Sequence, residues 1–117
     1  MSHKVDLIIA ILEHNNSGRM TRIRSKIDKG ELLAGIAEES GELTQAALKL
    51  RRAIDGRNLT PVARADAEAS YVEELADGLL YAWAYGIDAS RVATIMDRKI
   101  KRWDNRLGEG DTDDILQ

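Results

Sequence analysis

Two groups of acidic residues are the side chains of this chain best suited to chemistry. The first lies within residues 38–42 and the second within residues 73–77. Residues three or four apart share one face of a helix, so each group would place carboxylates side by side, where they repel each other. A divalent cation relieves that repulsion, and Mg²⁺ prefers oxygen ligands. We therefore predict a site that binds Mg²⁺, or Mn²⁺ in its place, through carboxylates of both groups: Glu39 or Glu38 beside Glu42, and Glu74 or Glu73 beside Asp77.

Two other interpretations of these acids compete with a metal site. Each group taken alone is typical of a solvated helix face, whose charges would pair with Arg51, Arg52 or Arg64. A di-iron carboxylate bundle would instead need a Glu-x-x-His motif on each of two helices, and neither group contains histidine. The presence of both groups, in mid-helix rather than at helix ends, favours the Mg²⁺ site.

The elements that must position these acids are predicted to be helices throughout. Ala, Leu, Glu, Arg and Lys dominate, and no stretch alternates polar and apolar residues with a period of two. Apolar side chains instead recur at steps of three and four residues, with Asn, Asp and Gly at the breaks. Thr60 before Pro61, the single proline, is typical of a helix start. We expect four helices, over about Lys4 to His14, Lys29 to Ile54, Pro61 to Tyr85, and from a cap at Asp88 or Ser90 to Leu107.

These helices predict an all-α fold, an up-and-down four-helix bundle with one longer connection. The 117 residues would form a single domain, 1–117, with its core at about 29–107 and an acidic tail at 108–117. The connection at 19–29 is the most basic segment, and it would either lie solvated at the surface or face a phosphate. Gly41 and Gly78 in mid-helix predict that a helix or a substrate comes close there.

Composition limits the chemistry and the location. There are no cysteines, which excludes disulfides and thiolate metal sites, and the two histidines, His3 and His14, argue against zinc chemistry. The N-terminal apolar run is too short and too charged for a secretory signal or a membrane span, so we expect a cytoplasmic protein with no membrane partner. A net charge of −3 argues against a stable nucleic-acid partner.

The end of the third helix predicts self-association. From Leu79 to Tyr85 the residues are apolar or aromatic on every side. A helix that is apolar all round must be buried all round, and one small four-helix chain achieves this poorly. We therefore expect a homo-oligomer, either a dimer or a tetramer.

The paired acidic motifs resemble the signature of a known superfamily. Glu39-x-x-Glu42 followed by Glu74-x-x-Asp77 is similar to the ExxE and ExxD motifs of the all-α nucleoside triphosphate pyrophosphatases, which include the MazG-like proteins. The longer strings are similar too: Glu-Glu-Ser-Gly-Glu-Leu resembles the family's EExGEL, and Glu-Glu-Leu-Ala-Asp-Gly-Leu-Leu-Tyr resembles its EELxDxLxY. The resemblance covers about Leu32 to Arg106.

This resemblance implies an enzyme that hydrolyses a ribo- or deoxyribonucleoside triphosphate to the monophosphate and pyrophosphate, with metal ions held by the four acids. Glu38 is the candidate catalytic base, or else a further metal ligand. Trp103 stands where the family's terminal basic motif often has asparagine, and it would either stack on a base or pack in an interface. Cations of that motif, three and four residues apart, would bind the phosphates: Lys99, Arg102 and Arg106.

Two other functions stay open at this point. One is a narrower specificity within the same chemistry, for dUTP, dCTP or phosphoribosyl-ATP. The other is a catalytically silent helical oligomer that binds nucleotides as a regulator. The presence of all four acids counts against the second.

Overall fold

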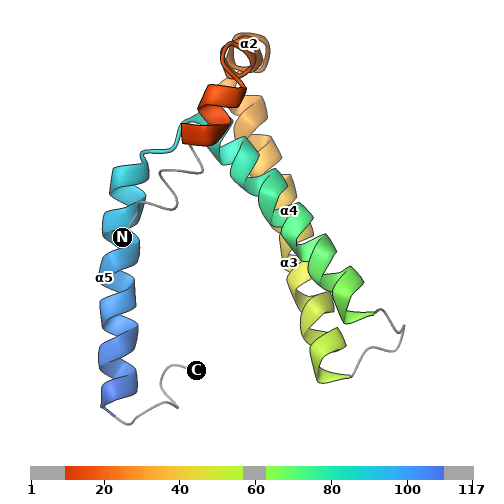
Figure 1. Ribbon diagram of the computed structural model, residues 1–117, viewed down its shortest axis with the longest axis vertical. Helices are drawn as coiled ribbons and strands as arrows, with labels where there is room; N and C mark the ends of the chain where they lie inside the picture. The colour runs from red at the N-terminus through yellow and green to blue at the C-terminus, as the bar shows by residue number, and fades with distance from the viewer. Residues whose placement is uncertain (1–9, 57–62, 110–117) are drawn as a thin grey trace. The chain divides into compact units, whose positions relative to one another are not determined.

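A computed structural model describes residues 10–56 and 63–109, and helix is the one kind of regular secondary structure in these residues (Figure 1). Residues 10–15 are helical. Four further helices lie wholly within the described residues: α2 (Arg19–Lys26), α3 (Lys29–Asp55), α4 (Arg64–Tyr85) and α5 (Ala89–Gly108). The all-α prediction is therefore confirmed for the described part of the chain.

The chain divides into two compact units, and each is described by itself. One unit contains residues 10–15 with α2, α3 and α4, and the other contains α5. The expected helix over Lys4 to His14 is seen where it falls within the described residues; its first six positions, at 4–9, lie outside them.

The ends of α3 follow from its sequence. The Asp28 carboxylate accepts a hydrogen bond from the backbone N–H of Glu31 at 2.8 Å, which satisfies a free donor of the first turn. At the other end Gly56 has a φ of 70°, in the left-handed region that glycine adopts without strain, and its N–H donates to the Arg52 carbonyl. The predicted span from Lys29 to Ile54 ends one residue short of the observed helix.

The start of α4 differs from the prediction, whereas α5 agrees with it. The structure begins α4 at Arg64, after the non-helical residue Ala63, so a helix that starts at Pro61 is wrong. The proposed cap itself, Thr60 with Pro61, lies outside the described residues. Helix α5 starts after Asp88, whose carboxylate accepts the backbone N–H of Arg91 at 3.0 Å.

The basic connection contains a helix that the sequence analysis did not predict. We expected a connection that is either solvated or faces a phosphate, yet this segment forms the helix α2, Arg19–Lys26. Arg, Met and Lys are good helix formers, and Gly18, with a φ of 85°, allows the tight turn that separates α2 from the preceding helix. The described part of the chain therefore has one helix more than expected.

Helix α2 docks on the C-terminal end of α4 through a side chain. Arg24 donates two hydrogen bonds to backbone carbonyls of α4, from Nε to Ala84 at 3.0 Å and from Nη2 to Trp83 at 2.9 Å. The last carbonyls of a helix lack partners within it and carry partial negative charge, and α4 has no basic residue in its own last turn. Arg24 therefore supplies both the missing donors and the missing positive charge.

Helices α3 and α4 run antiparallel side by side and carry the core of their unit (Figure 1). Their close approach occurs at Gly35, where an added Cβ would lie 2.2 Å from the Tyr81 ring. No helix of the described residues comes close at Gly41 or Gly78, because a Cβ at either position would meet nothing within 4 Å, and the approach of a substrate there stays a prediction. The buried apolar side chains are few and mostly small: Leu32, Ala46, Ala67 and Ala84.

Many large apolar side chains stay exposed. Leu79 and Leu80 on α4 are 56% and 50% exposed, although their neighbour Ala84 is buried. Along α5 the exposed apolar residues recur at steps of three and four: Val92, Met96, Ile100, Trp103 and Leu107. None of the helices described here is both long and apolar enough to cross a bilayer.

Candidate metal centre

The structure brings together three of the four acids that the sequence singled out. Glu39 on α3 and Glu74 and Asp77 on α4 each offer one carboxylate oxygen, and these oxygens all lie within 4.8 Å of one another. Asp77 follows Glu74 by three residues, so both reach the same face of α4, and the antiparallel pairing sets Glu39 opposite them. All three side chains are half-buried between the helices.

Glu42 lies at the edge of this acidic cluster of Glu39, Glu74 and Asp77. It is exposed and follows Glu39 by three residues on α3. Its carboxylate lies close enough to Glu39 and Glu74 to contribute to the raised pKa of each. The fourth predicted ligand thus borders the cluster without belonging to its tightest group.

Crowding of like charges makes the ionised cluster costly. Burial, followed by the neighbouring carboxylates of Glu42 and then Glu39, raises the pKa of Glu74 to about 7. Burial also raises the pKa of Glu39, with Glu42 and then Asp77 adding to the effect. The cluster therefore resists full ionisation at neutral pH unless positive charge is added.

The buried oxygens of the cluster have no donor in the described part of the chain. The Oε2 atoms of Glu39 and Glu74 are shielded from solvent and accept no hydrogen bond there. Two ionised carboxylates cannot satisfy each other, since both only accept hydrogen bonds, and a bond between them needs a shared proton. A buried acceptor without a donor is rare in folded proteins and points to a missing proton or cation.

Arginine does not neutralise the cluster. Arg51, one of the expected partners, lies 3.7 Å from Asp55 within α3. The other ion pair in the described residues joins Lys101 and Asp97 on α5 at 2.9 Å. Within the described residues these acids form no ion pair with arginine, whereas Glu38, Glu42 and Glu73 are exposed, as on a solvated helix face.

The donor set suits a hard divalent cation. It consists of carboxylate oxygens alone, with no sulfur or imidazole nitrogen, which is the ligand chemistry of Mg²⁺ and Mn²⁺. One such ion, bound by anionic ligands from two helices, would reduce the repulsion among them.

The remaining predicted site residues lie outside the acidic cluster. Glu38 is exposed on α3, immediately before Glu39. The predicted phosphate-binding cations are exposed on α5, in the other compact unit, and their spacing places them on one face of that helix: Lys99, Arg102 and Arg106.

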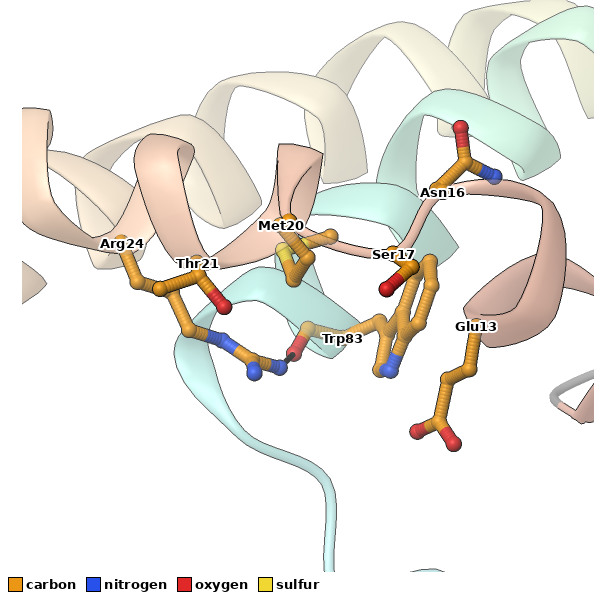
Figure 2. Close-up of a pocket in the computed structure, with 8 residues that line it drawn as sticks. Glu13, Asn16, Ser17, Met20, Thr21, Arg24 and Trp83 are labelled. Carbon is orange, nitrogen blue, oxygen red and sulfur yellow. Dashed lines mark hydrogen bonds between the residues drawn. The ribbon is translucent and has the colours of Figure 1, made fainter.

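A second feature of the unit was missed at the sequence level. A cavity of about 240 Å³ lies where α2 and the end of α4 meet the turn after residues 10–15 (Figure 2). Trp83 and Arg24 line it, together with Glu13 from residues 10–15. The sequence offered one signal for this cavity: Trp83 near the end of the third predicted helix, together with the basic segment at 19–29.

Comparison with protein-family models, curated proteins and solved structures gives no match to this chain.

Proposed function

We propose that this chain is a Mg²⁺-dependent nucleoside triphosphate pyrophosphohydrolase similar to the MazG-like proteins. The observation that carries the proposal is the acidic cluster. Carboxylates from two antiparallel helices gather within 4.8 Å, partly shielded from solvent and without a basic partner in the described residues. The order of these acids along the chain also matches the paired motifs of that superfamily.

The acids would hold the metal and one of their neighbours would move a proton. Glu39, Glu74 and Asp77 form the core of the ligand set, and Glu42 at its edge completes it. When bound, the metal ion supplies positive charge that stabilises the phosphate oxygens during an in-line displacement. Glu38 is exposed beside the ligands, so its carboxylate can accept the proton of an attacking water molecule.

The proposed reaction uses water and no further reactant. The water oxygen forms a bond to the α phosphorus, and the bond from that phosphorus to the bridging α–β oxygen breaks. The nucleoside monophosphate and pyrophosphate are the products, and the water proton passes to Glu38. That the cations of α5 bind the phosphates stays a prediction from the sequence: Lys99, Arg102 and Arg106.

We also propose that the chain functions as a homo-oligomer, either a dimer or a tetramer. The support is the exposure of Leu79 and Leu80, each at least half exposed in the single chain on a helix segment that is apolar all round. A second copy would remove this surface from water.

The test of the activity is pyrophosphate release from a panel of nucleoside triphosphates, with Mg²⁺, with Mn²⁺ and with a chelator. We expect release with either ion for at least one nucleotide, and none with the chelator. Nucleotide binding without release, in both metals, would instead identify a silent nucleotide-binding protein.

Matched variants then connect the activity to the cluster. Asp77→Asn removes one anionic ligand, whereas Glu68→Gln makes the same kind of change at an exposed position about two and a half turns earlier on α4. We expect the first variant to lose release and the second to keep it. Equal activity in both would remove the acidic cluster from the mechanism.

A further inference from the structure

The cavity beside Trp83 combines groups that suit a flat, neutral ring. Trp83 offers an aromatic face, Met20 an apolar surface, and Ser17 and Thr21 offer hydroxyl groups, all within one compact unit (Figure 2). Small-molecule pockets typically enclose roughly 300–1,000 Å³. A volume of about 240 Å³ therefore fits one ring system better than a whole nucleotide.

The two opposite charges at the cavity favour a ring without net charge. Arg24 is fixed there by its two hydrogen bonds to the α4 carbonyls, so its guanidinium disfavours a cation. Glu13 is exposed at the same cavity, and its carboxylate disfavours an anion such as a phosphate. A neutral ligand avoids both repulsions.

Glu13 also determines which edge the ring presents. Among the described residues no ion pair involves Glu13 and no side-chain hydrogen bond reaches its carboxylate, so within this part of the chain both oxygens can accept bonds from a ligand. A carboxylate only accepts hydrogen bonds, and its two oxygens suit two adjacent N–H donors. Guanine carries such a pair on one edge, its ring N–H and its exocyclic amino group, whereas uracil and thymine carry no amino group.

We propose that this cavity binds a guanine base, which stacks on Trp83 and donates two hydrogen bonds to Glu13. Stacking on an aromatic side chain is a common way for proteins to bind a base that is not paired. Trp83 follows Asp77 by six residues, so it lies about 9 Å further along α4 at 1.5 Å per residue. The assignment of this base to the hydrolysed nucleotide rests on the proposed function; the binding of free guanosine does not.

The test uses Trp83 fluorescence and the free nucleosides guanosine, inosine and uridine. The chain has two tryptophans, so Trp103→Phe leaves Trp83 as the sole indole. Inosine differs from guanosine by the absent amino group. We expect guanosine to quench the fluorescence at concentrations about tenfold lower than inosine or uridine, since hydrogen bonds to a charged group are the stronger kind.

Two further variants, built on Trp103→Phe, test the role of Glu13. Glu13→Gln changes an exposed side chain and leaves the fold intact, and it should remove the preference for guanosine over inosine. Glu68→Gln, an exposed change elsewhere on α4, should keep it. Equal binding of guanosine and uridine, no binding of guanosine, or an unchanged preference in Glu13→Gln would each overturn the proposal.

These measurements contain no phosphate and no metal, so they are independent of the proposed hydrolysis. If guanosine binds and no triphosphate is hydrolysed, the proposed function fails and the base site stands. If hydrolysis is found and guanosine does not bind, the base site fails alone. When both hold, release of pyrophosphate from GTP or dGTP should show the same dependence on Glu13.

Discussion

The ring of Tyr81 on α4 lies directly against the backbone of Gly35 on α3. A Cβ added at Gly35 would lie 2.2 Å from Tyr81 Cε1 and 2.4 Å from Cδ1. No real side chain tolerates such distances, and the contact is with a ring rather than with the end of a flexible chain. Only glycine allows this spacing of α3 and α4, on the same pair of helices that carries the acidic cluster.

We predict that Gly35→Ala destabilises the fold. Overpacking in a tight contact costs roughly 1–3 kcal/mol, which exceeds the gain of about 1 kcal/mol that alanine brings to a helix interior. Gly78→Ala is the control, because a Cβ there meets nothing within 4 Å, and it should raise the stability slightly. Urea unfolding measures both. A Gly35→Ala variant as stable as Gly78→Ala would contradict the close contact.

A second prediction concerns divalent metal and stability. Mg²⁺ should raise the melting temperature of the wild type, because an ion that binds only the folded chain stabilises it. Glu39→Gln, which removes a half-buried ligand, should abolish most of that rise, whereas Glu68→Gln should not. Thermal unfolding with and without Mg²⁺ gives the answer. The same rise in all three proteins would mean that the ion binds elsewhere.

A third prediction concerns the pH dependence of the metal-free protein. The pKa of Glu74 is about 7 in the folded chain against an ordinary value of 4.5, so the folded state binds more protons between these values. The stability that this proton provides is complete below pH 4.5 and is lost as the pH rises through 7. Glu74→Gln should therefore be more stable than wild type at pH 8, with the difference vanishing near pH 4.

The measurement is denaturant unfolding across this range in the presence of a chelator. Comparison of the wild type with Glu74→Gln cancels the titration of groups far from the cluster. A difference that grows toward low pH would show that the repulsion described here does not act on Glu74.

A fourth prediction concerns the docking of α2. Arg24→Ala removes two hydrogen bonds from the last carbonyls of α4 and should lower the stability by about 1.5–3 kcal/mol, the usual range for bonds that involve a charged group. Arg22→Ala removes an equal charge from an exposed position of the same helix. Hydrogen exchange of α4 should quicken at its C-terminal turn in the first variant only. Equal exchange in both variants would speak against the capping role.

A fifth prediction concerns assembly. Light scattering at micromolar concentration should give a dimer or a tetramer for the wild type. Leu79→Glu and Leu80→Glu place a charge on side chains that are already half exposed, so they should divide the oligomer while the helix content stays unchanged. A wild type that is monomeric and fully active would refute self-association.

The sequence was sufficient where local chemistry decides the structure. Asp88 before α5 caps its own helix, so its effect was predicted from neighbouring residues, and Asp28 and Gly56 at the ends of α3 act locally in the same way. Two acidic groups, each at a spacing of three residues, likewise predicted which carboxylates share a face. Only the pairing of the two helices was needed to bring them together.

Longer-range contacts could not be predicted in the same way. Arg24 reaches carbonyls about sixty positions later in the chain, and nothing in the composition of 19–29 distinguishes that role from a solvated charge. The importance of Gly35 depends on the register that sets it against Tyr81, so it was overlooked in favour of Gly41 and Gly78. Helix α2 was not predicted for the same reason, because the charges of this segment do not reveal its contacts with α4.

The acidic cluster comes from two helices that follow each other in the chain, which affects how the protein folds. Contacts between neighbouring elements require little loop-closure entropy, and chains rich in them fold quickly. The carboxylates of α3 and α4 therefore come together when the two helices pair, a step that does not require a second copy of the chain. On the proposed function, a divalent cation would bind at that step and favour the pairing by reducing the repulsion between the carboxylates.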